Sequence, residues 1–164
     1  MDFLLDKNME TEIKKVSADV VGAVNLIMNP TTPEIERRKA HELLEHFKDT
    51  SPLCAKCGFF LIARSNPPVI RHCGFQLIEN YVKLHWNDIN DDEKVRIKNN
   101  TMQTLASGTG PVLEEEMCIK DAMSRVVVEL AKREWPQHWT SLMEELHNIC
   151  RLGVFIISFL SLIF

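Results

Sequence analysis

The sequence predicts an all-α fold, an α-solenoid of HEAT-type helix pairs. Apolar residues recur at steps of three and four along nearly the whole chain, as they do on one face of a helix. Strand signals are missing, because the sequence has no Asn-Gly or Asp-Gly turns and no sustained apolar–polar alternation. Helix start and stop signals divide the chain into about seven helices, and successive pairs repeat at roughly 40 residues, the period of HEAT arrays. This predicts about three to three and a half repeats.

The first two helices are separated by Asn29 and Pro30, which stop the first one. The apolar face of the first helix is formed by Ile13, Val16, Val20, Val24 and Ile27. Thr32 can cap the second helix, with Pro33 at its first position and acidic residues in its first turn. We expect the apolar face of this second helix to consist of Ile35, Leu43, Leu44 and Phe47.

The third and fourth helices follow Pro52 and the "SNPP" segment at residues 65–68. Ser51 followed by Pro52 repeats the start signal of the second helix. The buried side of the third helix would carry Leu53, Cys57, Phe60 and Leu61. The long fourth helix would bury Ile70, Cys73, Leu77, Ile78, Tyr81 and Leu84.

The fifth helix begins at Asn90, which is spaced from Glu93 as in a helix start, and runs towards "ASGTGP" at residues 106–111. The sixth opens at "LEEE" (residues 113–116), where acidic residues suit the positive end of the helix dipole. We interpret these glutamates as solvated residues at a helix start. The buried stripe of the sixth helix is Ile119, Met123, Val126, Val127 and Leu130.

Two tryptophans and a proline mark the turn after the sixth helix, in the segment "REWPQHW". Pro136 lacks an N–H and disfavours a helical conformation at Trp135, so the sixth helix should end near Trp135 and Pro136 should start a seventh. Trp139 would then lie one turn into the new helix. We expect both indoles to be buried in this elbow as structural anchors, since each can bury roughly 150–250 Å².

Composition fits one globular domain and argues against several kinds of site. The 164 residues are 45% hydrophobic and 26% charged, with a net charge of −4. The basic clusters are brief, so the chain lacks the broad positive surface on which nucleic-acid affinity depends. The N-terminus has no secretory signal, and free thiols in a reducing compartment are the default for the five cysteines.

No set of residues in the sequence forms a credible active site, so we expect neither an enzyme nor a cofactor. Cys54, Cys57, His72 and Cys73 could in principle bind zinc. However, the first two fall on one predicted helix, and the adjacent His72 and Cys73 point to different sides. Buried thiols that act as small apolar groups are the better interpretation. "HELLEH" lacks the spacing of a zinc protease, and "ASGTGP" lacks the lysine and the strand of a phosphate loop.

Four segments resemble, in order, the N-terminal regions of exportins in the importin-β (karyopherin) superfamily, in particular those that carry pre-microRNA. They are "PLCAKCGFFLIA" (Pro52–Ala63), "VIRHCGFQLIENYVKLHWNDI" (Val69–Ile89), "EKVRIKNNTMQTLASGT" (Glu93–Thr109) and "IKDAMSRVVVELAKREWPQHWTSLMEEL" (Ile119–Leu146). The resemblance implies the first HEAT repeats of a nuclear transport receptor that shuttles between nucleus and cytoplasm. It implies binding of the small GTPase Ran in its GTP form, and of structured RNA cargo through the much longer remainder of such a receptor.

The resemblance also suggests where Ran would bind, because the family places these contacts on the second helices of the first repeats. The polar side of the fourth helix offers Arg71, Gln76, Glu79, Asn80 and Lys83 as candidates, ahead of Arg37 and Arg38. An ordinary solvated helix face is an equally good interpretation of these residues. A general protein-binding scaffold with no role in Ran binding or export is the alternative function.

By this resemblance, residues 1–110 form importin-β N-terminal-like repeats, and residues 111–152 start an exportin-type helical region. Residues 153–164 form an apolar tail outside the family pattern, and we interpret the chain as a truncated form. The tail could cover the open end of the helical array, form an aggregation-prone strand or, less favoured, anchor in a membrane. We expect no stable membrane association.

Overall fold

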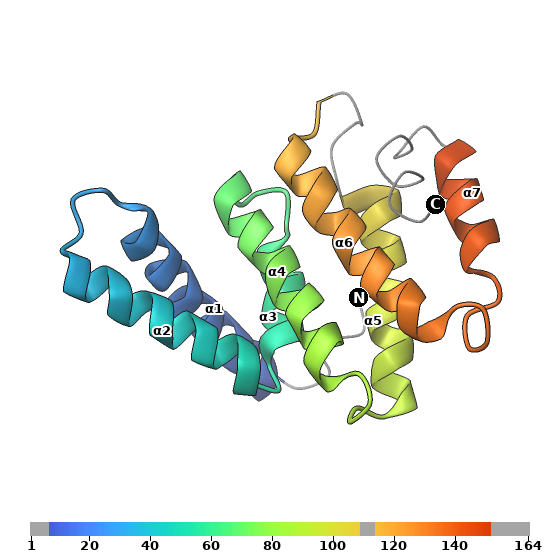
Figure 1. Cartoon of the computed structure of the whole chain (residues 1–164), viewed down its shortest axis with the longest axis horizontal. Helices are drawn as coiled ribbons and strands as arrows, with labels where there is room; N and C mark the ends of the chain where they lie inside the picture. Colours follow the sequence, from blue (N-terminus) through green and yellow to red (C-terminus); the bar gives the residue numbers. More distant parts are fainter. Residues whose placement is uncertain (1–6, 109–113, 152–164) are drawn as a thin grey trace.

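The computed structural model describes residues 7–108 and 114–151, and all regular secondary structure in these two ranges is helical (Figure 1). The order of elements confirms the predicted all-α fold with helices in successive pairs. The elements are α1 (Lys7–Met28), α2 (Glu34–Thr50), α3 (Cys54–Leu61), α4 (Pro68–His85), α5 (Asp91–Gln103), the π-helix η1 (Thr104–Gly108), α6 (Met117–Glu134) and α7 (Leu142–Arg151).

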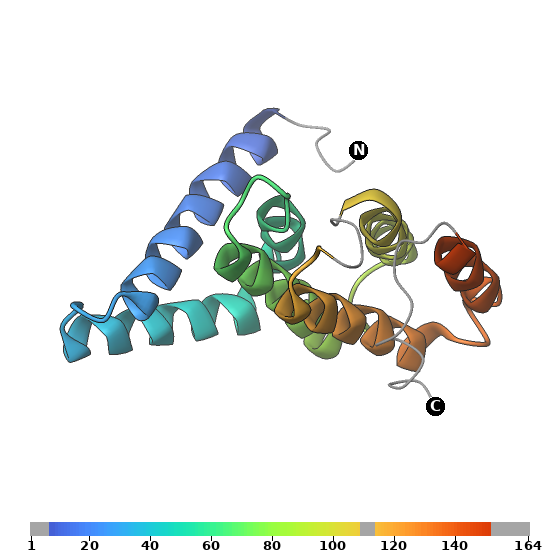
Figure 2. The same cartoon turned by 90° about the horizontal axis from the view of Figure 1, so that it is seen from above.

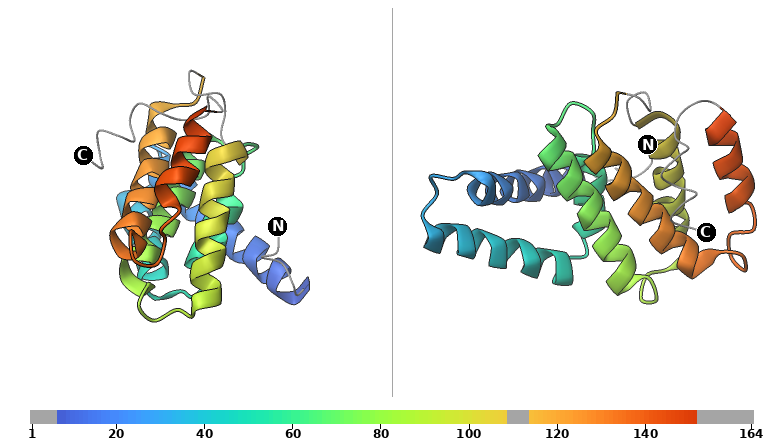
Figure 3. Two further views of the ribbon diagram at one scale, coloured as in Figure 1. Left: turned by 90° about the vertical axis from the view of Figure 1, so that its right-hand side faces the viewer. Right: turned by 45° about the horizontal axis from the view of Figure 1, so that its top comes forward.

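The helices form two layers, as expected for stacked HEAT-type pairs. Seen from above, α1, α3 and α5 lie in one layer and α2, α4 and α6 in the other, with α7 next to α5 at the end of the array (Figure 2). Within the second layer, α2, α4 and α6 follow one another in chain order (Figure 3). Helix α4 is central, because it packs against its partner α3 and against both α2 and α6.

Some predicted helix starts are confirmed and others are wrong; α3, for example, begins at Cys54 and not at Pro52. Asn90 caps α5, and its side-chain oxygen accepts a hydrogen bond from the backbone N–H of Glu93 at 2.8 Å. Thr32 does not cap α2; Pro33 occupies that position, without a side-chain cap. Helix α6 begins at Met117, after the acidic segment, so the glutamates do not lie in its first turn.

The predicted buried stripes match the core closely in α1 and α6. All five stripe residues of α6 are buried, and Ile13, Val20 and Val24 of α1 are buried while Val16 and Ile27 are partly so. Four predicted core residues are instead exposed: Ile35, Leu43, Phe60 and Leu84. Helical periodicity identifies an apolar face but not how much of that face a neighbour covers. Helix α2 packs mainly against α1 and α4, and Ile35 and Leu43 remain exposed.

Two glycines set the close approach of α3 and α4. A Cβ atom at Gly58 would lie 2.7 Å from the carbonyl oxygen of Gly74, and one at Gly74 would lie 2.9 Å from the carbonyl oxygen of Gly58. Each distance is shorter than ordinary van der Waals contact, so the two backbones can only meet here without side chains. The crossing fixes where α4 sits in the second layer.

The link between α6 and α7 differs in part from the prediction. Helix α6 ends at Glu134 and Trp135 adopts an extended conformation, as expected before a proline. Pro136 does not start α7, which begins at Leu142, so Trp139 lies in the link. Trp139 is buried, but Trp135 is 42% exposed, and only Trp139 acts as an anchor; its indole N–H donates to Glu145 at 3.1 Å.

Candidate partner-binding surface

Four of the five predicted Ran-binding residues lie on the part of α4 that packing leaves accessible. Gln76, Glu79 and Asn80 are partly exposed and Lys83 is exposed, whereas the residues between them are buried in the core. Their spacing places them on one side of the helix. We call these four residues the α4 face.

Arg71, the fifth predicted residue, is not on this face, and the expectation that it is accessible was wrong. Its guanidinium forms two hydrogen bonds with the carboxylate of Glu115, at 2.9 and 2.8 Å, and a third with the carbonyl oxygen of Ile62 at 3.3 Å. Both side chains of the ion pair are buried. Glu115 is therefore not a solvated residue at a helix start, because it neutralises a buried charge on α4.

Of the two less favoured candidates, Arg37 also has a structural role. Its Nη2 donates to the carbonyl oxygens of Asn29, Pro30 and Thr32, which holds the turn between α1 and α2. Arg38 remains exposed beside Glu42, with their charged atoms 3.9 Å apart.

Polar contacts connect the α4 face to the helices on either side. The amide of Asn80 donates to the carbonyl oxygen of Lys48, at the end of α2, at 3.2 Å. On the other side, the carboxylate of Glu79 pairs with Lys83 and accepts from Nε of Arg125 on α6 at 3.2 Å. A partner that contacts the α4 face would therefore also meet residues of α2 and α6.

His72 lies one turn before Gln76 and is kept neutral by its surroundings. Burial lowers the pKa of His72, and the positive charge of Arg125 lowers it further, while Glu79 acts in the opposite direction. A positive charge on His72 is thus disfavoured in the folded protein at neutral pH.

A second polar cluster, centred on Glu134, was not predicted from the sequence. Its carboxylate accepts from the indole N–H of Trp86 at 2.9 Å and from Lys98 at 2.8 Å. Burial alone would raise the pKa of Glu134, but the hydrogen bonds from Lys98 and Trp86 outweigh it and hold the pKa below its ordinary value. Lys98 also lies 5.6 Å from the ring centre of Trp139. The cluster joins the end of α4, α5 and the α6–α7 link.

The cysteines of α3 and α4 are part of the core, as predicted. Cys54, Cys57 and Cys73 are buried, and burial raises the pKa of the Cys54 thiol to about 12. The pKa values of Cys57 and Cys73 are raised for the same reason. Among the described residues, no three His, Cys, Asp or Glu side chains are grouped as metal ligands.

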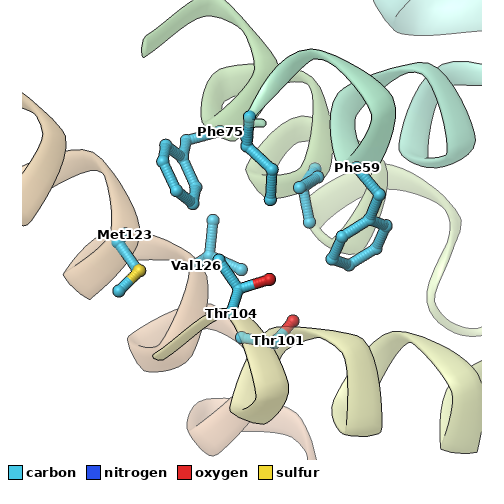
Figure 4. Close-up of a pocket in the computed structure, with 8 residues that line it drawn as sticks. Phe59, Phe75, Thr101, Thr104, Met123 and Val126 are labelled. Atoms are coloured by element: carbon cyan, nitrogen blue, oxygen red, sulfur yellow. The ribbon is translucent and has the colours of Figure 1, made fainter. Parts of the chain in front are cut away.

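The pocket in Figure 4 lies between α3, α4, the end of α5 with η1, and α6, and it is not a ligand site. Its lining is mostly apolar, including Phe59, Phe75 and Met123, and it is too narrow for a water molecule. The hydroxyls of Thr101 and Thr104, which reach it, donate to the carbonyl oxygens of Ile97 and Asn100, one turn earlier in α5. No helix within the described ranges is long and apolar enough to cross a bilayer.

Comparison with known proteins finds a domain match and similar sequences for this helical array. Residues 40–107 match the importin-beta N-terminal domain. The chain is 41% identical to exportin-5 of Mus musculus over 145 residues, 87% of this chain and 12% of that protein. It is 40% identical to exportin-5 of Homo sapiens over 142 residues, with the same coverage of both chains. Exportin-5 of Dictyostelium discoideum is 27% identical over 145 residues, 88% of this chain and 12% of the relative.

The chain thus spans about 12% of the length of these relatives. The matched residues 40–107 include α3, α4 and α5, and so contain the glycine crossing and the α4 face. A helical array of this kind, with the family match inside it, is what the sequence resemblance implied. Residues 40–107 thus match the importin-beta N-terminal domain, and the sequence of the chain is similar to that of exportin-5.

Proposed function

We propose that this chain is the Ran-GTP-binding N-terminal arch of a nuclear export receptor of exportin-5 type. The observation that supports this best is the α4 face: a strip of partly exposed polar residues on the central helix of the second layer, within the matched importin-β N-terminal domain. Its function is binding without catalysis. The energy for directional transport comes from the nucleotide state of Ran, which the receptor reads by contacts that differ between the two states.

The proposal extends to the organisation of the chain. Residues 1–110 form importin-β N-terminal-like repeats, residues 111–152 start the exportin-type helical region, and residues 153–164 lie outside the family pattern. Pre-microRNA or other structured RNA would be enclosed by parts of the receptor that this chain, at 12% of the relatives' length, does not contain. The receptor would shuttle between nucleus and cytoplasm through nuclear pores.

A nucleotide-dependent binding assay tests the proposal. The full chain is immobilised and offered Ran loaded with a non-hydrolysable GTP analogue or with GDP. We expect binding of the GTP form only, and weaker binding by a Gln76→Ala/Lys83→Ala variant. Lys15→Ala is the matched control, because it also removes one positive charge, from an exposed position of α1, in the other layer. Equal binding of the two nucleotide forms, or binding of neither, would refute the proposal and favour a general helical-repeat scaffold.

A further inference from the structure

Helices α4 and α6 meet along a row of ion pairs in which positive and negative groups differ in exposure. The two helices run side by side in the second layer (Figures 1 and 3) and pack directly against each other. We call this row the α4–α6 seam; it consists of Glu79, Lys83, Arg125, Glu129, Lys132 and Arg133.

The carboxylates of the seam are mostly covered, and three of its four cations are much more exposed, whereas the side chain of Arg133 is 25% exposed. The side chains of Glu79 and Glu129 are 12% and 11% exposed. Those of Lys83 and Arg125 are 43% and 42% exposed, and that of Lys132 is 62% exposed. The surface that a partner would touch is therefore positive, although the chain as a whole carries a net charge of −4.

Hydrogen bonds fix the orientation of these cations. Glu129 accepts from Lys132 at 2.9 Å and from Arg133 at 2.6 Å, and Arg133 also donates to the carbonyl oxygen of Lys83 at 3.2 Å. The hydrogen bonds from Lys132 and Arg133 outweigh the effect of burial and hold the pKa of Glu129 below its ordinary value. Cations that are already held in place lose less side-chain entropy when they bind a carboxylate.

We propose that the α4–α6 seam is a docking surface for an acidic segment of a protein partner. Carboxylates of that segment would contact Arg125 and Lys132 on α6 and Lys83 on α4. An acidic protein fits better than a nucleic acid, because the row is short and contains its own carboxylates, whereas nucleic-acid binding depends on neutralising many phosphates. Towards the start of α6 the row is bounded by Asp121, one turn before Arg125.

The seam shares Glu79 and Lys83 with the α4 face, but this inference goes beyond the proposed function, because its partner need not be Ran and its test variants leave both residues unchanged. Its test uses a fluorescein-labelled oligoglutamate peptide and, separately, an oligouridylate of the same charge, with binding to the full chain followed by fluorescence anisotropy. We expect Arg125→Glu/Lys132→Glu to weaken peptide binding about tenfold at low salt, since two attractive contacts become repulsive. Lys14→Glu/Lys15→Glu, which changes the net charge equally on another layer, should bind like the wild type.

Arg125→Gln/Lys132→Gln keeps the test valid if charge reversal beside Glu79 disturbs folding, which circular dichroism will report. This milder variant should weaken peptide binding about threefold. No binding of the peptide to the wild type, or an equal loss in the α1 control, would overturn the proposal. Tighter binding of the oligouridylate through the same residues would also overturn it, in favour of a phosphate-binding surface.

Discussion

The glycine crossing of α3 and α4 gives a quantitative test of how this helical array is held together. A methyl group at residue 74 would lie 2.9 Å from the carbonyl oxygen of Gly58 and 2.9 Å from Cγ2 of Ile62. The carbonyl belongs to the backbone of α3, so relief requires a shift of one helix against the other. Gly22 of α1 is the control, because a methyl group there would have no atom within 4 Å.

Two opposing contributions determine the stability of Gly74→Ala. Alanine in the interior of a helix is favoured over glycine by about 1 kcal/mol. Overpacking at a close-packed contact costs about 1–3 kcal/mol. Gly74→Ala should therefore change the free energy of unfolding by between about zero and 2 kcal/mol in the destabilising direction, while Gly22→Ala should be stabilising by up to about 1 kcal/mol.

The assay is urea unfolding of both variants, followed by circular dichroism. The difference between Gly22→Ala and Gly74→Ala removes the shared contribution of helix propensity and leaves the cost of the clash, about 1–3 kcal/mol. If Gly74→Ala proves as stable as Gly22→Ala, α3 and α4 do not approach each other closely at Gly58 and Gly74.

Three further predictions concern polar and aromatic side chains. Glu115→Leu should lower the free energy of unfolding by about 3–5 kcal/mol, because it leaves the buried Arg71 without a countercharge. Adding Arg71→Met should restore part of this stability. A double variant less stable than Glu115→Leu alone, measured in a double-mutant cycle, would contradict the prediction. Because the pKa of Glu134 is lowered in the folded state, its contribution to stability is fully present above its ordinary pKa and is lost as the pH falls through the folded value. Glu134→Gln should therefore flatten the acid limb of urea midpoints measured from neutral to acidic pH; an unchanged limb would count against this role. Trp135→Phe should remove most of the acrylamide-quenchable fluorescence, since Trp86 and Trp139 are buried, and persistent quenching would show that one of them is accessible.

The helical architecture could be predicted from the sequence because its signals are local. The period of apolar residues, the Asn90 cap and the position of Trp135 before Pro136 each act within a few residues, and the structure agrees with them. Where the packing of several elements determines whether a residue is buried, the same patterns predicted burial less well. Leu43 lies on an apolar face that α1 and α4 leave uncovered, and Trp135 lies in a link where only Trp139 is enclosed.

The polar contacts of the candidate surface could not be predicted, because they join residues far apart in sequence. Arg71 and Glu115 are both charged, so nothing local distinguishes them from solvated residues; only the packing of the segment before α6 against α4 buries them. The same is true of Glu134, whose partners Trp86 and Lys98 belong to other elements. The "EEE" segment (residues 114–116) was the one sign in the sequence of a carboxylate in this region. Its position beside a helix start favoured the wrong interpretation, that these glutamates are solvated.

The α4 face and the α4–α6 seam depend on where α4 lies relative to its neighbours. A substitution that disturbs the packing of α4 should therefore affect binding as well as stability. In a helical array each repeat contacts only its neighbours, so a displacement of α4 cannot be corrected from farther along the chain. The methyl group of Gly74→Ala would push α4 away from α3. This shift would change the position of Lys83 on α4 relative to Arg125 on α6. This variant should therefore weaken oligoglutamate binding at the seam even under conditions where it remains fully folded, whereas Gly22→Ala should not. Unchanged binding by a folded Gly74→Ala variant would mean that the cations act independently, as separate flexible charges, and that the two helices do not need a fixed geometry to bind a partner.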